Sequence, residues 1–272
     1  MGVDVVTYMS VKIPSVEELL KAGVHFGHNE SRWHPRMEPY IYTTRAGTHI
    51  IHLEKTREML NAAAEFAAGV AAKGGVVLFL GTKRQAKAIV EAKAKECGAP
   101  VITGKWIGGL LTNWPTVSLK IKSLRKLKDQ REKGELKKYT KREQLTIERE
   151  IAKLTDEVGG IESMTKPPEA LFIIDIKEEK TALKEAGRMN IPVIALVDTN
   201  TNPDKADYPI PANDDAVKSL DLIIGSISQA IAAAKAAAPK EEKAESSQKK
   251  PAAKPATPKA AEPKKTETKE TK

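Results

Sequence analysis

The stretch VVLFLGTKRQAKAIVEAKAKEC, residues 76–97, decides the fold class. Its first five residues, Val76–Leu80, form a continuous apolar run of the length of a strand. Gly81 and the polar residues after it mark a turn, and Gln85–Cys97 has the amphipathic pattern of a helix. A strand that is apolar at every position must be buried on both faces. The stretch therefore predicts one strand and one helix of a parallel sheet covered by helices.

The same alternation of apolar blocks and helices continues on both sides of this stretch. Ser15, with Glu18 three residues later, is a capping box for a first helix. Further strands are predicted at residues 100–102, 170–176 and 192–197, and helices at 16–22, 53–72, 178–189 and from the capping residues Asn213 and Asp214 towards Ala238. This order predicts an α/β fold with a doubly wound parallel sheet.

Residues 117–158 depart from the alternation. Apolar residues recur at intervals of four and three in segments 117–128 and 147–158, and the other positions are heavily charged. Such narrow apolar stripes are typical of helices that pack mainly on each other. Gly134 separates the segments, and Thr140 with Glu143 forms a second capping box. We expect an inserted antiparallel coiled-coil helical hairpin; a pair of ordinary surface helices is the alternative.

Charge is distributed unevenly along the chain. The 45 Lys and Arg against 36 Asp and Glu give a formal net charge of +9, which favours a polyanionic partner such as RNA, DNA or an acidic membrane surface. Residues 117–157 contain thirteen basic and eight acidic residues, whereas residues 160–238 contain eight basic and twelve acidic ones. This polarity indicates one face that meets a polyanion.

Three further features limit the class of protein. Residues 239–272 contain no aromatic or branched aliphatic residue, so a disordered C-terminal tail is expected. The single cysteine, Cys97, excludes a disulfide framework and a multi-cysteine zinc site. Pure apolar runs fall far short of the roughly 20 residues of a membrane span, and no signal peptide is apparent. We expect a soluble, cytoplasmic protein with no membrane partner.

Two features raise the alternative of an enzyme. The turn from Gly81 to Arg84 lies where a phosphate could bind a helix N-terminus, but it lacks the glycine spacing of a nucleotide-binding loop. Acidic residues also gather after predicted strand ends, where ligands bind in doubly wound folds: Asp175, Asp198, Asp204, Asp207, Asp214 and Asp215. No nucleophile or phosphate loop accompanies them, and turn formation and helix capping already explain them. We therefore expect no catalytic residue.

Residues 26–52 are expected to form a loop that contacts RNA, because basic and aromatic residues are interleaved without clear periodicity. Guanidinium groups bind phosphates, and planar rings stack on splayed bases. The contacts expected here are Arg32, Trp33, His34, Arg36 and Arg45; an anchoring role for Trp33 and Tyr40 is the alternative. All five histidines lie between His25 and His52, but no acidic or sulfur ligand stands at a recognised metal spacing, so no metal site is expected.

Nine short segments together resemble the bacterial small-subunit ribosomal protein two family. They are GVHFGH (23–28), RWHPRM (32–37), PYI (39–41), HIIHLEKT (49–56), GTKRQA (81–86), WIGGLLTNW (106–114), PEALFIID (168–175), IPVIALVDTN (191–200) and YPIPANDDA (208–216). The resemblance covers roughly residues 15–234 in unbroken order. The residues before Ser15 and the Lys/Ala/Pro-rich tail depart from it.

The resemblance implies a non-catalytic constituent of the small ribosomal subunit, with a flavodoxin-like α/β domain and an inserted coiled-coil hairpin. It implies binding to small-subunit ribosomal RNA between the head and the body, contacts with other small-subunit proteins, and recruitment of the large mRNA-binding ribosomal protein one. It implies neither a cofactor nor a small-molecule substrate. Matched motifs and charge add further expected RNA contacts: Lys83, Arg84, Lys105, Lys120, Lys122 and Arg125.

The expected domain boundaries follow from these assignments. Residues 1–116 and 159–238 are the two parts of the α/β domain, 117–158 the hairpin and 239–272 the tail. Two alternative functions are a nucleotide- or sugar-phosphate-binding enzyme and a protein-interaction adaptor. The enzyme should lose activity on Asp198→Ala, whereas the adaptor should lose partner binding on deletion of residues 120–153.

Overall fold

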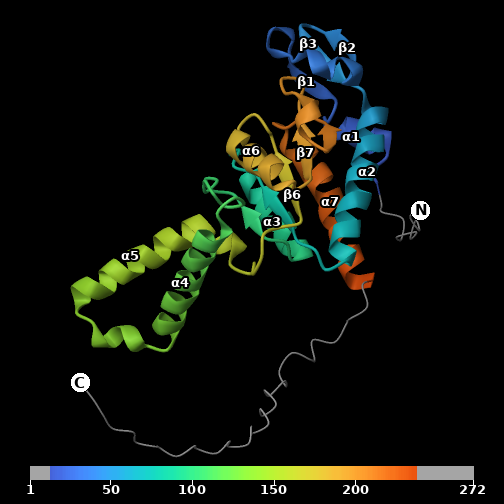
Figure 1. Cartoon of the computed structure of the whole chain (residues 1–272). Helices are drawn as coiled ribbons and strands as arrows, with labels where there is room; N and C mark the ends of the chain where they lie inside the picture. The colour runs from blue at the N-terminus through green and yellow to red at the C-terminus, as the bar shows by residue number, and fades with distance from the viewer. Residues whose placement is uncertain (1–12, 238–272) are drawn as a thin grey trace, which may run out of the picture. The chain divides into compact units, whose positions relative to one another are not determined.

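The computed structural model describes residues 13–237, and within them a five-stranded parallel sheet forms the centre of the α/β domain (Figure 1). Its strands are β4 (Val77–Leu80), β5 (Val101–Ile102), β6 (Ala170–Ile174), β7 (Val193–Val197) and β8 (Tyr208–Pro211). Their order is β5-β4-β6-β7-β8, and every neighbouring pair is parallel. This order matches a flavodoxin-like doubly wound sheet, so the predicted α/β class is confirmed.

Successive residues of each strand enter two separate cores. In β4, Val77 and Phe79 belong to one core, and Leu78 and Leu80 belong to the other. All residues of β4, β6 and β7 are buried. Burial on both faces explains why the sequence shows continuous apolar runs where a half-exposed sheet would show alternation.

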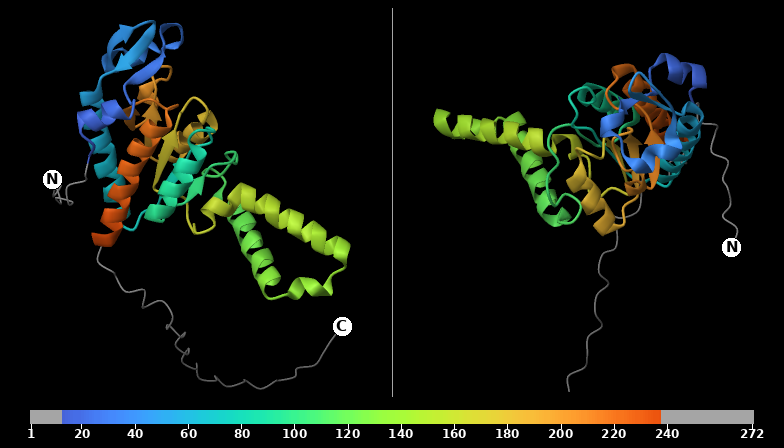
Figure 2. Two further views of the ribbon diagram at one scale, coloured as in Figure 1. Left: turned by 180° about the vertical axis from the view of Figure 1, so that it is seen from behind. Right: turned by 90° about the horizontal axis from the view of Figure 1, so that it is seen from above.

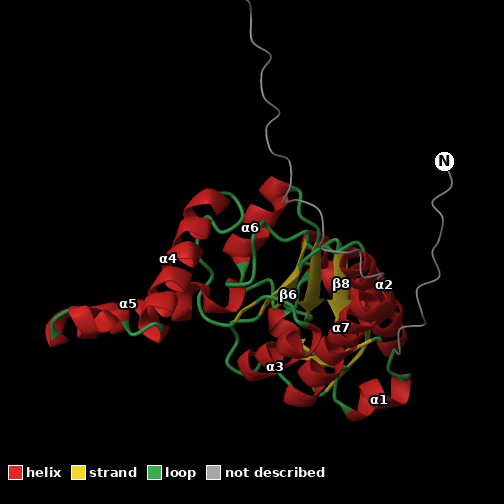
Figure 3. Cartoon of the chain, turned by 90° about the horizontal axis from the view of Figure 1, so that it is seen from below, coloured by secondary structure: helices red, strands yellow, loops and turns green. Residues whose placement is uncertain are grey.

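Helices cover both faces of the sheet, as Figures 2 and 3 show. α2 (Leu53–Ala72), α3 (Lys87–Cys97) and α7 (Val217–Ala237) build the core on one face, and α6 (Lys180–Met189) contributes to the core on the other. The buried stripe of α2 consists largely of alanine, which lets α7 pack closely against it. Among the described helices, α7 alone is long and apolar enough to cross a membrane. More than half of that stretch is buried inside the protein, as in an ordinary core helix.

The region predicted as a loop, residues 26–52, contains a second, antiparallel sheet instead. After α1 (Val16–Lys21), β1 (Phe26–Asn29), β2 (Ile41–Arg45) and β3 (Thr48–Ile51) pair in the order β1-β3-β2, with the 3-10 helices η1 (Glu30–Arg32) and η2 (Pro35–Tyr40) between β1 and β2. Irregular strand registers and the two short helices interrupt the alternation that identifies strands in a sequence. The loop prediction was therefore wrong for most of this region, which we call the N-terminal sheet.

α4 (Trp114–Glu132), η3 (Glu135–Lys138) and α5 (Lys141–Val158) form the predicted pair of inserted helices, which lies outside the layers of the α/β domain (Figure 1). The helices run antiparallel. Lys120 near the start of α4 pairs with Glu157 near the end of α5 at 2.9 Å, and Arg131 pairs with Glu148 at 3.6 Å. The predicted capping box is present at the start of α5. A coiled-coil twist between the helices stays a prediction.

The base of this helix pair packs on the α/β domain. Val117, Ile121 and Leu124 of α4 belong to the same buried cluster as residues of β4, β6 and β7. Gly160, after α5, lies so close to the carbonyl oxygen of Val101 in β5 that a Cβ atom there would overlap it. The two helices were expected to pack mainly on each other. At their base they pack on the α/β domain as well, so this expectation is wrong there.

Some element ends differ from the predictions for local reasons. β6 stops at Ile174 because Asp175 adopts a positive φ of 66°. β8 was not predicted, because two prolines in four residues argue against a strand in a sequence, although they are tolerated in a strand at the edge of a sheet. Asn213, whose Oδ1 accepts the N–H groups of residues 215 and 216, acts as expected near the start of α7, but Asp214 is buried in another cluster. α3 and α6 each start two residues late, at Lys87 and Lys180.

Residues 1–12 and 238–272 are not described by the structure. The predicted disordered tail therefore lies outside the described residues. The domain boundaries at residues 116, 158 and 238 stay predictions.

Candidate RNA-binding surfaces

The N-terminal sheet carries three exposed guanidinium groups among the predicted RNA contacts. Arg32 lies in η1, Arg36 in η2 and Arg45 at the end of β2. Arg36 pairs with Asp204 at 3.4 Å in an exposed position, whereas Arg32 and Arg45 form no ion pair with any residue that the structure describes. Two unpaired guanidinium groups on one small sheet can donate to phosphate oxygens without giving up an internal partner.

Trp33 and His34 also have contacts within the protein. The ring centroids of Trp33 and His49 are 5.3 Å apart, and 37% of Trp33 is exposed. The Nδ1 atom of His34 accepts a hydrogen bond from the Arg36 N–H at 3.2 Å, which caps η2. Trp33 can therefore anchor this region through His49 and still present part of its ring to a base. His34 has one ring nitrogen already in use.

Thr199, which follows β7, fixes the N-terminal sheet to the strand ends of the α/β domain. Its Oγ1 accepts the His28 N–H at 2.8 Å, and its carbonyl accepts the His34 N–H at 2.8 Å. Gly27 makes this close approach possible, since a Cβ atom there would lie 2.5 Å from the Thr199 methyl group. The glycine between Phe26 and His28 is therefore needed for docking.

A buried acidic cluster lies beneath this contact, at the carboxyl ends of β4, β6, β7 and β8. Lys83 Nζ lies 2.8 Å from Asp214 Oδ1, 2.8 Å from Asp215 Oδ1 and 3.2 Å from Asp175 Oδ2. His28 Nδ1 lies 3.0 Å from Asp198 Oδ2. Asp175, Asp198 and Asp214 are almost completely buried. We refer to these four aspartates with Lys83 and His28 as the strand-end cluster.

Burial and like charges change the proton affinities in the strand-end cluster. Burial, together with the charges of Asp198 and Asp175, raises the pKa of Asp214 to about 7 despite the nearby Lys83. The hydrogen bond to Asp198 raises the pKa of His28, against the opposing effect of burial. Burial alone would lower the pKa of Lys83, but the surrounding carboxylates outweigh it and raise the pKa, so the ammonium stays charged.

This environment changes the interpretation of Lys83 as an RNA contact. An ammonium held by three carboxylates has little attraction left for a phosphate, and its side chain is only 18% exposed. Lys83 is therefore not among the RNA contacts that we propose. Its neighbour Arg84 is exposed and forms no ion pair within residues 13–237. Lys105 is exposed too, but it lines a cavity of about 520 Å³ together with Asp156, Glu178 and Glu179.

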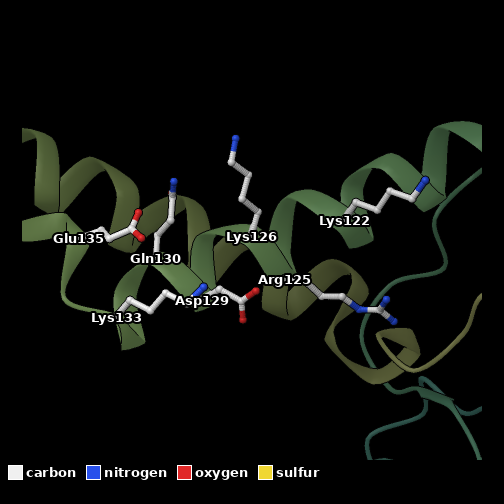
Figure 4. A pocket seen from close by; sticks show the side chains of 7 residues that line it. All are labelled: Lys122, Arg125, Lys126, Asp129, Gln130, Lys133 and Glu135. Carbon is white, nitrogen blue, oxygen red and sulfur yellow. The ribbon is translucent and has the colours of Figure 1, made fainter.

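α4 presents a second basic surface. A groove of about 350 Å³ is lined by Lys122, Arg125, Lys126, Asp129, Gln130, Lys133 and Glu135 (Figure 4). Figure 4 shows Lys126 and Gln130 pointing to the same side of the helix, with Lys122 one turn away. Lys122 and Lys126 form no ion pair among the described residues, whereas Lys120 pairs with Glu157 and Arg125 donates to the carbonyl of Glu162.

The structure places the predicted contacts on three separate parts of the chain: the N-terminal sheet, the region of Arg84 and Lys105, and α4. Sequence reasoning missed Lys126 and Lys133, although their spacing from Lys122 on one helix face was a visible signal. It placed the four aspartates of the strand-end cluster after predicted strand ends, but it missed their association with His28 and Lys83, since these residues are distant from them in the sequence. Two of the five histidines pack on aromatic rings: His25 on Phe26, and His52 on Tyr42.

Comparison with known proteins identifies the family. The family model for ribosomal protein S2 matches residues 19–234, most of the chain. A small ribosomal subunit protein uS2 of Dehalococcoides mccartyi is 46% identical over 217 residues, which are 80% of this chain and 89% of the relative. One from Crocosphaera subtropica is 44% identical over 219 residues, 80% and 81% of the two chains, and a uS2c protein of Rhodomonas salina is 43% identical over 219 residues, 80% and 90%. The chain therefore belongs to the ribosomal protein S2 family, whose members are structural proteins of the small ribosomal subunit and not enzymes.

Proposed function

We propose that this protein binds small-subunit ribosomal RNA through the N-terminal sheet and α4. The observation that carries the proposal is the presence of exposed cationic side chains without an acidic partner among the described residues, Arg32, Arg45 and Lys122, on two folded elements. Most of the affinity of such surfaces comes from phosphate contacts and the release of counterions. Trp33 adds a partly exposed ring that can stack on an unpaired base.

Residues with internal partners have a smaller part in the proposal. Arg36, Lys120 and Arg125 must share their charge with Asp204, Glu157 and the carbonyl of Glu162. His34, whose Nδ1 accepts the Arg36 N–H, and Lys105, which lines a cavity with three acidic residues, are secondary contacts. Arg84 is exposed and unpaired among the described residues, so we propose it as a further contact outside these two surfaces. The resulting order of importance places unpaired exposed cations first and paired ones after them.

The wider assembly role rests on the family and its matched segments. We infer that the protein lies between the head and the body of the subunit, contacts other small-subunit proteins, and supports recruitment of the mRNA-binding ribosomal protein one where that protein is present. The cytoplasmic ribosome is then its location. Small subunits from cells depleted of this chain should lack ribosomal protein one, and re-addition of the chain should restore it. Subunits that keep ribosomal protein one after depletion would contradict the recruitment role.

A salt titration with matched variants tests RNA binding. The triple variant Arg32→Gln/Arg45→Gln/Lys122→Gln removes three unpaired cations from the proposed surfaces. Its control, Lys73→Gln/Lys180→Gln/Arg188→Gln, removes the same charge from exposed positions at the C-cap of α2 and on α6. If each cation contacts one phosphate, the slope of log K against log salt should become shallower by about 2 to 3 units in the first variant and stay unchanged in the control. An equal decrease of affinity in both would show that only net charge matters.

A second experiment tests the ribosomal role itself. Tagged protein in a lysate should sediment with small subunits on a sucrose gradient, and it should remain with them when lower Mg²⁺ dissociates whole ribosomes. The triple variant should shift towards the light fractions, while the control variant stays with the subunits. Wild-type protein found only in the light fractions would contradict the role.

A further inference from the structure

The cavity of about 520 Å³ in the α/β domain lies where the strand connections of the parallel sheet change direction. The chain passes from β4 to β5 towards one edge of the sheet, and from β6 through β7 to β8 towards the other edge. Doubly wound sheets bind ligands beyond the carboxyl ends of the two strands at which this change occurs, here β4 and β6. The cavity is lined there by Thr82 after β4, Lys105 after β5 and Glu179 after β6. Its volume is in the range of pockets that hold small organic ligands.

Glu179 is a buried carboxylate in the lining of this cavity, and no cation neutralises it. Only 5% of the residue is exposed, and it forms no ion pair within residues 13–237. The hydroxyl group of Thr82 donates a hydrogen bond to its Oε1 atom. Burial raises the pKa of Glu179 despite this hydrogen bond, and the charges of Asp175 and Glu178 raise it further. A ligand that donates hydrogen bonds to the carboxylate would therefore stabilise its charged form.

Two unpaired cations line the same cavity from the side of β4 and β5. Lys87 is the first residue of α3, and Lys105 follows β5. Both residues are exposed, and neither forms an ion pair in the part of the chain that the structure describes. Glu178 and Glu179 come from the side of β6. The sheet topology thus places anion-binding groups and hydrogen-bond acceptors on different sides of one cavity.

We propose that this cavity binds one guanine nucleotide, with its phosphate at Lys87 and Lys105 and its base at Glu179. The Watson–Crick edge of guanine has two adjacent donors, N1–H and the N2 amino group, which match the two acceptor oxygens of a carboxylate. Adenine and cytosine have an acceptor nitrogen beside their amino group, and this nitrogen would face a carboxylate oxygen. The carboxylate therefore selects guanine.

The remaining lining suits the other parts of a nucleotide. Trp106 forms an apolar wall, since its ring N–H is already donated to Glu185. Asp156, which lies beside Gly104, can accept a hydrogen bond from a ribose hydroxyl. A free nucleotide and an unpaired guanosine within RNA present the same groups to the cavity. None of the described residues that line it belongs to the N-terminal sheet or to α4, so the site is distinct from the two surfaces proposed for RNA binding.

Binding to the full-length protein tests the base preference and identifies the source of the nucleotide. GMP, AMP and CMP are titrated by calorimetry, and oligouridine with one central guanosine is compared with the same strand carrying one central adenosine. We expect one GMP per chain and a preference for guanine of about 5- to 100-fold, the discrimination given by one bidentate pair. A gain from the guanosine in the oligonucleotide identifies RNA as the source, whereas binding of GMP without that gain identifies the free nucleotide.

The proposal is overturned if neither the free nucleotides nor the two oligonucleotides show a preference for guanine. That result would leave RNA binding through the N-terminal sheet and α4 intact, because the two oligonucleotides carry the same charge and differ in one base alone.

Variants locate the base and the phosphate. Glu179→Gln should remove most of the preference for guanine, since an amide has one acceptor and one donor group where a carboxylate has two acceptors. Lys87→Gln should weaken the binding of all three nucleotides equally and leave the preference unchanged. The control variants Lys95→Gln and Glu96→Gln, at exposed positions near the other end of α3, should bind as the wild type does. An undiminished preference in Glu179→Gln would overturn the position of the base.

If Glu179→Gln does not fold, the indole N–H signals in the NMR spectrum of the wild-type protein decide instead. The chain has three tryptophans, Trp33, Trp106 and Trp114, of which Trp106 lines the cavity. Saturation with GMP or with the guanosine-containing oligonucleotide must shift the Trp106 signal. An unchanged Trp106 signal overturns the proposal.

Discussion

Lys83 and Lys122 have the same side chain and were predicted from sequence to have the same role, but their surroundings are opposite. Lys83 is mostly buried and lies within 3.2 Å of three carboxylates. Lys122 is exposed on α4 and forms no ion pair among the described residues. The partners of a lysine, and not its presence in a motif, therefore decide whether its ammonium is available to an external anion.

The largest effect that tests this comparison should come from Lys83→Met. It removes the ammonium while most of the side-chain volume stays, and it leaves buried carboxylates without their lysine. We expect the free energy of unfolding to fall by about 3 to 5 kcal/mol, as for other broken buried ion pairs. Urea unfolding of Lys83→Met and of the control Lys122→Met measures it. A decrease below about 1 kcal/mol for Lys83→Met, the range of exposed ion pairs, would show that its buried carboxylate partners add no more stability than exposed ones.

The second largest decrease in the free energy of unfolding should come from a change at Glu185 of α6, a buried charged group whose carboxylate accepts several hydrogen bonds. Its carboxylate accepts the Trp106 ring N–H at 3.2 Å and the N–H groups of Gly109 and Leu111 at 2.8 and 3.1 Å. These bonds outweigh burial and lower the pKa of Glu185. Glu185→Ala should cost about 2 to 3 kcal/mol, since these donors and the two of Thr112 lose a charged acceptor. The exposed Glu178→Ala is the control, with a change below about 0.5 kcal/mol.

The pH dependence of the same residue follows from the sign of its shift. A pKa that is lower in the folded than in the unfolded protein gives stability that is present above the ordinary value of 4.5 and is lost as the pH falls through the folded value. Denaturation curves between about pH 7 and pH 3 should therefore fall less steeply in acid for Glu185→Gln than for the wild type. Parallel curves would show that Glu185 does not gain stability from ionisation.

Gly27→Ala tests how the N-terminal sheet is held, with a somewhat smaller effect. The added Cβ would lie 2.5 Å from the Thr199 methyl group, so the sheet or the Thr199 backbone must move. We expect the free energy of unfolding to fall by about 1 to 3 kcal/mol, as for other overpacked sites. Hydrogen exchange should become faster in β1–β3 and remain unchanged in β6 and β7. A variant with Thr199→Ser as well should recover part of the stability, because the methyl group is gone.

The smallest change in stability should come from Lys122→Met and Lys126→Met on α4. Both side chains are accessible to solvent, so unfolding free energies should change by less than about 0.5 kcal/mol. RNA affinity should nonetheless fall, and the salt slope should decrease by about one unit for each phosphate that is no longer bound. Arg131→Met, which removes a cation already paired with Glu148 at 3.6 Å, should have a smaller effect on affinity. The opposite ranking would contradict the argument from pairing.

Sequence reasoning succeeded where a pattern is local. Continuous apolar runs identified β4, β6 and β7, and capping boxes identified the starts of α1 and α5. The prediction from sequence failed for strands that depend on pairing with other strands. The three strands of the N-terminal sheet depend on irregular pairing, and β8 depends on the neighbouring β7.

The predicted RNA contacts show the same division between local and distant causes. Arg32, Arg45 and Lys122 are exposed, as the prediction that they contact RNA requires. This could be expected from the residue types alone, because charged side chains are normally solvated. Lys83 could not be judged from its motif, since its partners Asp175 and Asp214 come from strands that only the folded sheet brings alongside. The parallel topology, and not the local sequence, created the strand-end cluster.

Lysine acetylation of the free protein and of assembled small subunits measures the accessibility of Lys83 and of Lys122 in a single experiment. The reactivity of each lysine is quantified by peptide mass spectrometry under identical conditions. In the free protein, Lys122 and Lys126 should react readily and Lys83 should react slowly. In the subunit, Lys122 and Lys126 should become protected, while Lys83 stays slow in both states. Unprotected Lys122 and Lys126 in the subunit, or a Lys83 that is reactive when free and protected only after assembly, would contradict the account.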